Sequence, residues 1–188
     1  MTSSKNYKYS YKKSGVNIDL GNKLVKSISP LAKETRLPGV ISNLGGFGGI
    51  FDLKYKNYKD PILVATTDGV GTKLILAKEL NSYSTIGIDL VAMSVNDLIV
   101  QGAEPVFFLD YIAIEKLDIK KVVSIINGIK DGCIESACSL IGGETAELPG
   151  LYSNQNFDLA GFAVGIVERN NILPKKDIKE NDILIGLE

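Results

Sequence analysis

The residues best suited to chemistry lie in one short run, Thr66–Lys73, which reads TTDGVGTK. Within it Asp68 supplies a carboxylate, Thr72 a hydroxyl and Lys73 an ammonium group, and two glycines leave the backbone bare. Carboxylate oxygens suit a hard cation such as Mg²⁺, and bare amides beside a positive charge suit phosphate oxygens. The competing interpretation is a hairpin turn, because Asp-Gly is a common pair in such turns. The residues alone leave both interpretations open.

Two further acids have surroundings like those of Asp68. Asp68 and Glu144 each follow a short apolar run that predicts a strand, and Asp97 lies on a predicted helix between them. Strand ends and a neighbouring helix often meet at one rim of such folds, where three acidic oxygens would suit Mg²⁺. The alternative for Asp97 is an ion pair or a cap, and the alternative for the set is three unrelated surface acids.

A glycine-rich segment, Asn43–Gly49, reads NLGGFGG. Its glycines are Gly45, Gly46, Gly48 and Gly49. Such a loop is either a flexible connector or a flap whose amides close over an anion. It has neither the GxGxxG spacing of a dinucleotide-binding turn nor the GK[ST] ending of a P-loop.

The periodicity of apolar residues predicts alternating strands and helices. Strands are predicted over 62–65, 106–113, 140–143, 159–167 and from Ile183 to Leu187, and helices over 19–33, 84–101 and 119–140. Pro30 is expected to weaken the last turn of the first helix. On the second helix Asp89, Met93 and Asp97 share one face. The order of elements predicts a mixed α/β sandwich with helices on one face.

The composition excludes several classes of function. The chain has 188 residues, a net charge of −1 and no histidine. This charge gives no electrostatic case for binding nucleic acid or an anionic membrane, and without histidine no Ser-His or Cys-His mechanism is possible. Cys133 and Cys138 are predicted to be buried free thiols, because their spacing is wrong for a CxxC pair. No apolar run could span a bilayer and residues 1–13 lack a signal-peptide core, so a cytoplasmic protein is expected.

Five blocks with family-like spacing run through most of the chain. They are YKKSGVNIDLGN (11–22), LGGFGG (44–49), TTDGVGTK (66–73), TIGIDLVAMSVNDLIVQGAEPVFFLDY (85–111) and SLIGGETAELPGLY (139–152). Together they closely resemble the N-terminal half of phosphoribosylformylglycinamidine cyclo-ligase, also called aminoimidazole ribonucleotide (AIR) synthetase. Selenophosphate synthetase, thiamine-monophosphate kinase and the hydrogenase-maturation carbamoyl dehydratase share only fragments of these motifs.

The resemblance implies an activity, a fold and partners. The activity is the ATP-dependent cyclisation of formylglycinamidine ribonucleotide to aminoimidazole ribonucleotide in purine synthesis. ATP would phosphorylate the formamide oxygen, and the amidine-side nitrogen would then attack the activated carbon as phosphate leaves. The implied fold is α+β, a mixed β-sheet with helices packed on one face, which forms an intersubunit barrel in a homodimer. ATP and Mg²⁺ are expected near that dimer interface, under the glycine-rich loop.

The resemblance also implies roles for individual residues. Asp68, Asp97 and Glu144 match the Mg²⁺-binding acids of the family. The implied ATP site comprises Gly45, Gly46, Gly48, Gly49, Thr67, Asp68, Gly69, Gly71, Thr72, Lys73 and Asp97. The role of Asp89 is open between a ligand contact and a structural hydrogen bond. The resemblance identifies no catalytic residue in this chain.

The expected organisation follows from the same resemblance. Residues 1–17 are predicted to form a flexible arm, 18–170 the ATP-binding and dimerisation domain, and 171–188 the start of a linker to a C-terminal domain. Members of the family continue into a second half that carries much of the substrate site. The chain is therefore expected to be an N-terminal piece, natural or engineered. The alternative is an inert nucleotide-binding or dimerisation module, and the VGTK, VQGAEPVFFLDY and GGETAELPG blocks disfavour a kinase.

Overall fold

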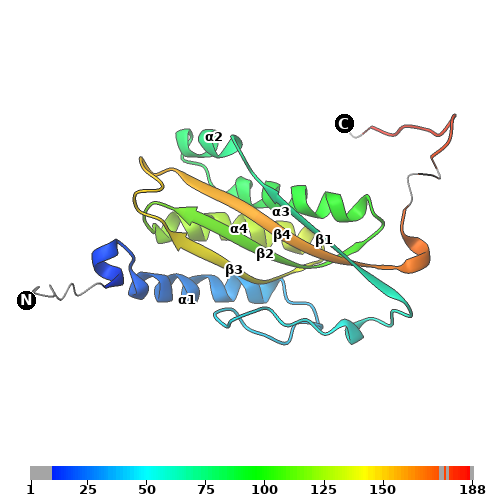
Figure 1. The fold of residues 1–188 in the computed structure, drawn as a ribbon, viewed down its shortest axis with the longest axis horizontal. Coiled ribbons are helices and arrows are strands. Elements are labelled where there is room, and N and C mark those ends of the chain that lie inside the picture. Colours follow the sequence, from blue (N-terminus) through cyan, green and yellow to red (C-terminus); the bar gives the residue numbers. More distant parts are fainter. Residues whose placement is uncertain (1–9, 174–175, 177, 187–188) are drawn as a thin grey trace, which may run out of the picture.

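A four-stranded mixed β-sheet forms the centre of the computed structural model, which describes residues 10–173, 176 and 178–186 (Figure 1). The strands are β1 (Pro61–Gly69), β2 (Glu104–Ile114), β3 (Ser139–Glu147) and β4 (Phe157–Glu168). Their order across the sheet is β1-β4-β2-β3. β4 pairs antiparallel with β1 and with β2, whereas β2 and β3 are parallel. β1 and β3 are therefore the two edges.

The longer helices cover one face of this sheet. The α-helices are α1 (Ile18–Glu34), α2 (Lys73–Glu79), α3 (Ser84–Ile99) and α4 (Ile119–Glu135), and short 3-10 helices span Tyr11–Ser14, Leu53–Tyr55 and Arg169–Asn171. In Figure 1, α3 and α4 lie behind the sheet and α1 runs along the β3 edge. The predicted mixed sheet with helices on one face is confirmed. In the part of the chain that the structure describes, no helix is long and apolar enough to cross a membrane.

Polar caps fix the starts of two helices. Asn17 Oδ1 accepts a hydrogen bond from the Leu20 amide at 3.1 Å, and Asp118 Oδ1 accepts one from the Lys120 amide at 2.9 Å. Such caps satisfy amides that have no partner inside the helix. Pro30 lies inside α1, which nevertheless continues to Glu34. The predicted weakening of the last turn therefore does not shorten this helix.

Helices α3 and α4 pack so closely that their two backbones touch. A Cβ atom added to Gly87 would overlap the backbone carbonyl of Ile125, and one added to Gly128 would overlap that of Ser84. Only glycine leaves room for backbones this close. The two helices thus fit side by side over the four strands, and their buried faces form the main core. That core includes Leu90, Leu98, Phe108, Ile112, Ile125, Ile129 and Leu159.

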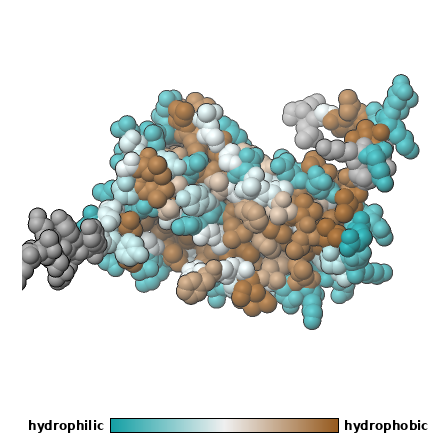
Figure 2. Space-filling model, viewed as in Figure 1, coloured by the Kyte–Doolittle hydropathy of each residue, from teal (hydrophilic) through white to brown (hydrophobic). Residues whose placement is uncertain are grey.

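Among the described residues, side chains cover one end of the opposite face of the sheet. There Phe51, Tyr55 and Tyr58 pack on the cluster of Val106, Val164 and Ile166. Over the rest of this face, Leu63, Phe162 and Tyr111 are 58%, 42% and 40% exposed. Figure 2 shows apolar side chains gathered over the sheet on this side. We call this region, defined by Leu63, Tyr111 and Phe162, the open face.

The predicted helix over 119–140 is too long. α4 ends at Glu135, Ala137 has a positive φ of 51°, and β3 begins at Ser139. The buried strand residues Leu140 and Ile141 extend the apolar pattern of the helix, so periodicity alone does not show the boundary. β3 also runs to Glu147, beyond the predicted end at 143.

Two other segments of the structure differ from the secondary structure predicted from the sequence. Helix α2 (Lys73–Glu79) was not predicted, and it begins at Lys73, the last of the residues assigned to phosphate binding. The strand predicted from Ile183 is wrong within the described residues, since 183–186 have no regular structure. Leu187, at the end of that prediction, lies outside the described residues.

The predicted N-terminal arm is described only in part, because residues 1–9 lie outside the described range. Residues 11–14 form a 3-10 helix, and the Asn17 amide donates a hydrogen bond of 2.8 Å to Glu147 Oε2. The described part of the arm is therefore attached to the end of β3.

Gly128→Ala should lower the free energy of unfolding by about 3 kcal/mol, because two packed backbones must separate to admit the methyl group. Gly21→Ala is the matched control, since nothing lies within 4 Å of a Cβ added to that position of α1. It should raise stability by about 0.5–1 kcal/mol. Urea unfolding of both variants measures the difference, and equal effects would contradict the backbone contact.

Candidate functional site

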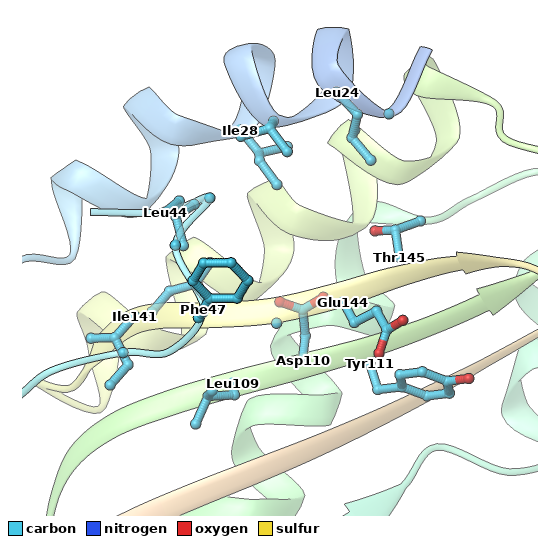
Figure 3. Close-up of a pocket in the computed structure, with 18 of the residues that line it drawn as sticks. Leu24, Ile28, Leu44, Phe47, Leu109, Asp110, Tyr111, Ile141, Glu144 and Thr145 are labelled. Carbon is cyan, nitrogen blue, oxygen red and sulfur yellow. The ribbon is translucent and has the colours of Figure 1, made fainter. Parts of the chain in front are cut away.

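A cavity of about 590 Å³ opens beside the β3 edge, and we call it the glycine-loop cavity (Figure 3). Its walls come from α1, the loop Asn43–Gly49, and strands β2 and β3. Apolar side chains form much of the wall, among them Leu24, Ile28, Leu44, Leu109 and Ile141. In Figure 3, Leu24 and Ile28 lie on the α1 side, and Phe47 lies on the loop in front of the strands. The cavity therefore combines an apolar wall with a glycine-rich rim.

The four predicted loop glycines, Gly45, Gly46, Gly48 and Gly49, all line this cavity. Gly45 has φ +94°, and a Cβ on Gly49 would overlap the side chain of Ile141. The base of the loop is closed by a hydrogen bond of 2.8 Å from the Ile50 amide to Ser42 Oγ. Phe47, at the tip, is fully exposed. The structure thus places the loop over a cavity.

The charges in the glycine-loop cavity are negative. The carboxyl groups of Asp110, Glu144 and Glu147 line it, and no Lys or Arg side chain belongs to the described lining. Glu147 is already engaged, because its two oxygens accept hydrogen bonds of 2.8 Å from the amides of Asn17 and Leu117. It therefore fastens the segments before α1 and α4 to the end of β3. Asp110 and Glu144 are the acids left to meet a ligand.

Asp110 is the most unusual of these acids. It lies on β2 between Gly161 of β4 and Gly143 of β3, and it is only 8% exposed. A Cβ on Gly143, which has φ +156°, would overlap Asp110 Oδ1, so the carboxyl fits only because Gly143 has no side chain. Burial raises the pKa of Asp110 from 3.8 to about 7. Its own backbone amide opposes this shift.

A second group of polar residues lies at the other edge of the sheet, where β1 ends. Lys73 Nζ is 2.5 Å from Asp89 Oδ2 and 3.5 Å from Met93 Sδ, without hydrogen-bond geometry at Asp89 Oδ2. This arrangement confirms that Asp89 and Met93 share one face of α3. Asp68 Oδ1 accepts a hydrogen bond of 2.8 Å from the adjacent Gly69 amide, and Asp68 and Asp97 are both exposed.

The turn from β1 to α2 contains the remaining predicted phosphate-side residues. Gly71 has φ +70°, which favours glycine there. Thr72 is the N-cap of α2 but makes no side-chain cap hydrogen bond, so its hydroxyl is not used to close the helix. Thr67 Oγ1 donates a hydrogen bond of 2.9 Å to the Gly161 carbonyl on the neighbouring strand.

The three acids predicted to share one Mg²⁺ ion do not meet within one chain. Asp68 lies on β1 and Glu144 on β3, with β4 and β2 between them. Adjacent strands lie about 4.8 Å apart, so three steps separate these backbones by about 14 Å. Among the residues that the structure describes, no three acids, cysteines or histidines are grouped to hold a metal ion. Carboxylate oxygens of Asp68 and Asp97 still have the chemistry that Mg²⁺ requires.

Asp110 and Glu147 were missed from the sequence as site residues. Asp110 follows Phe108 and precedes Ile112 at alternate strand positions, both of them buried. An acid at an inward position of an apolar strand was a detectable signal. Glu147 had no such signal, because its partners are backbone amides more than a hundred residues away in one case. Cys133 and Cys138 are buried and free, as predicted.

Comparison with known protein families gives one match. The family model described as "AIR synthase related protein, N-terminal domain" matches residues 53–167. This segment contains all four strands of the sheet and helices α2, α3 and α4. It therefore includes the whole sheet and the β1 end, whereas α1 and the glycine-rich loop precede it.

Solved structures share the fold at low sequence identity. Thiamine-monophosphate kinase from Stenotrophomonas maltophilia K279a superposes with a TM-score of 0.59 and 19% identity, over 77% of this chain and 42% of that one. E. coli HypE gives a TM-score of 0.63 and 15% identity, over 84% and 47%. A structure of the hydrogenase maturation protein HypE in complex with ATP gives 0.56 and 16%, over 83% and 41%. The chain thus spans less than half the length of each of these proteins.

The buried Asp110 predicts how stability depends on pH. Its raised pKa means that the native state binds more protons than the unfolded state between about pH 4 and 7. The free energy of unfolding therefore falls as the pH rises through this window, by up to about 4 kcal/mol from this group.

Asp110→Asn should remove that contribution, so the variant should become more stable relative to the wild type between pH 5 and 8. Urea unfolding of both proteins at each pH isolates the effect from other carboxyl groups. A constant difference between them would show that Asp110 titrates normally.

Proposed function

Because the chain belongs to the family of AIR synthase related proteins through its N-terminal domain, we propose that it is the ATP- and Mg²⁺-binding part of a cyclo-ligase. The reaction is the ATP-dependent closure of formylglycinamidine ribonucleotide to aminoimidazole ribonucleotide, a step of purine synthesis in the cytoplasm. The observation that carries the proposal is the set of phosphate-side residues at the end of β1. Asp68 and Lys73 there supply a carboxylate and an ammonium group, and Asp97 lies on α3, about two helical turns beyond the Asp89 that contacts Lys73.

Asp68 and Asp97 are the residues proposed to hold Mg²⁺ in this chain. When bound with ATP, the ion would neutralise phosphate charge and make the terminal phosphorus easier to attack. The backbone of Gly69 and Gly71 would face the phosphate oxygens. Lys73 is held near this position by Asp89, which keeps its ammonium group beside the turn. The existence of a HypE structure in complex with ATP supports nucleotide binding by this fold.

The remaining predicted nucleotide contacts are those of Thr67, Thr72 and the loop glycines. Because the loop lies at the β3 edge, opposite the β1 edge, the loop glycines Gly45, Gly46, Gly48 and Gly49 are proposed to close with their backbone amides over the nucleotide held at the β1 edge of the partner subunit. Fixing each loop residue costs about 1–2 kcal/mol of conformational entropy. We therefore expect the isolated chain to bind ATP weakly, and contacts from substrate and a second domain to offset this cost.

A homodimer completes the proposed site. The open face exposes apolar side chains over a sheet, and a second copy of the same face would bury them as an intersubunit barrel. Glu144 cannot reach Asp68 in its own chain across two intervening strands. We assign this ligand role to Glu144 of the partner subunit. The proposed site then combines elements of two copies.

The proposal divides the chain as the resemblance implies. Residues 18–170 form the nucleotide-binding and dimerisation domain, 1–17 an arm, and 171–188 the start of a linker to a C-terminal domain. The fold relatives are more than twice as long as the part that this chain matches. A C-terminal half would supply most of the substrate site, and the alternative function for the chain alone is an inert nucleotide-binding or dimerisation module.

The direct test is formation of aminoimidazole ribonucleotide from formylglycinamidine ribonucleotide and ATP, with and without a separately made C-terminal half. Product should form only with both halves, because substrate must be held next to the terminal phosphate in a dry site. Asp68→Ala should abolish it. Product from this chain alone would overturn the division of the site, and absence of product with both halves would favour the inert module.

Asp97→Asn should weaken Mg·ATP binding about tenfold, because a hard-cation site loses an anionic oxygen ligand. Asp89→Asn is the matched control on the same face of α3. It should have a smaller effect, since Asp89 neutralises Lys73 and its loss leaves that ammonium group freer to meet phosphate. Titration followed by ³¹P NMR at millimolar ATP measures both. Equal effects would contradict the role of Asp97 as a ligand.

A further inference from the structure

The glycine-loop cavity is poorly suited to a triphosphate. Three carboxyl groups line it and no described Lys or Arg side chain does, so phosphate oxygens would meet negative charge. The ammonium group expected to meet phosphate, that of Lys73, lies at the opposite edge of the sheet beside Asp89. The charge of the cavity instead favours a ligand that brings positive charge or hydrogen-bond donors.

Asp110 provides an observation independent of this acidic lining. It is more than nine-tenths buried, and the small part that remains accessible lies in the lining of the cavity. Within the described residues, the one hydrogen-bond donor identified at its carboxyl is its own backbone amide, and no other residue donates to it. Figure 3 shows the carboxyl rising from β2 to the level of β3, on the side where α1 and the loop lie. A buried acid without a partner is costly once ionised, so a donor from a ligand would relieve that cost.

The surroundings of Asp110 restrict the kind of donor. Leu24, Ile28 and Ile141 form apolar walls, and the Phe47 and Tyr111 rings border the cavity. A compact, strongly hydrated cation such as Mg²⁺ keeps several waters and prefers more oxygen ligands than one carboxyl offers. A flat, delocalised cation with two parallel N–H donors is more weakly hydrated and matches both oxygens of a carboxylate.

We propose that the glycine-loop cavity binds a planar amidinium group through the carboxylate of Asp110. The inference deepens the proposed function and in that respect rests on it, because formylglycinamidine ribonucleotide carries an amidine. It assigns the amidine end of the substrate to the β2–β3 side of the sheet. Asp110 then acts as a binding residue for the substrate, distinct from the acids assigned to Mg²⁺.

Gly143 contributes to the same proposed binding site. Its lack of a side chain lets Asp110 Oδ1 reach past the backbone of β3, which any Cβ at that position would prevent. Glu144 of β3 shares the cavity lining with Asp110. Cys133 of α4 lies close enough to sense the charge of Asp110, and its hydrogen bond with Cys138 and its burial raise the pKa of its thiol, which stays neutral. The lining residues of α1 carry no charged side chain. Asp110 is therefore the buried anion that a ligand entering past α1 would meet.

The test uses benzamidine and its neutral analogue benzamide, titrated into the ¹⁵N-labelled 188-residue protein at pH 8. Benzamidine should bind at least about tenfold more tightly than benzamide, as expected for a charge-assisted pair of hydrogen bonds. The shifts of the Leu109 and Gly143 amides should saturate with binding. Equal affinities, or shifts confined to residues outside the cavity, would overturn the proposal.

Asp110→Asn should abolish the preference for benzamidine. The substitution keeps the shape of the side chain and removes a buried charge, so the variant is expected to fold. Asp158→Asn, the same change on β4 outside the lining of this cavity, should leave the preference intact. A preference that survives Asp110→Asn would overturn the assignment. So would saturation of the Gly143 shifts by MgCl₂ alone, which would identify a metal site.

This experiment contains neither ATP nor a purine intermediate, so it separates the two proposals. If benzamidine binds through Asp110 but both halves of the protein make no aminoimidazole ribonucleotide, the proposed reaction fails and the amidinium site stands. If benzamidine does not bind while the reaction proceeds and needs Asp68, the amidinium site fails and the proposed function stands.

Discussion

The backbone contact between α3 and α4 is the constraint on which the rest of the structure depends. Gly87 and Gly128 let the backbones of these two helices touch, and both helices lie over the same face of the four-stranded sheet. One consequence is that α3 is fixed above β1, so that Thr66 Oγ1 donates a hydrogen bond of 2.8 Å to the Ser94 carbonyl. The other is that both helices lie on the face opposite the open face, where Leu63, Tyr111 and Phe162 remain exposed.

The same arrangement separates the polar residues into two groups with different charge. At the β1 edge, Asp68 lies at the end of β1, and Asp89 accompanies the only ammonium group in the predicted phosphate turn, that of Lys73. At the β3 edge, Asp110 and Glu144 border an apolar cavity that no described basic side chain lines. Phosphate and a cationic group would therefore be favoured at opposite edges of one chain. A reaction between them requires either a ligand that spans the sheet or a second copy of the chain.

The parts predictable from sequence are those with local causes. Strand β1 and helix α3 follow from apolar periodicity, although β1 extends past its predicted end at 65 to include Asp68, and the glycine loop follows from composition. The boundary between α4 and β3 was not predictable in this way, because buried residues continue across Ala137. The order of the strands in the sheet could not be predicted from the sequence either, and this order separates Asp68 from Glu144. The sequence placed these acids in similar local settings, but their distance depends on long-range pairing with β4 and β2.

The central claim is that two copies of the chain build one nucleotide site, and complementation tests it most directly. Asp68→Asn and Glu144→Gln would each be made in otherwise unchanged protein, and Mg·ATP binding followed at millimolar ATP. Each variant alone should lose binding. If the two acids come from different subunits, mixing the variants should restore about a quarter of the wild-type sites, since half of randomly formed dimers carry one intact site of two. No restoration, with mixed dimers demonstrated, would show that both acids act within one chain.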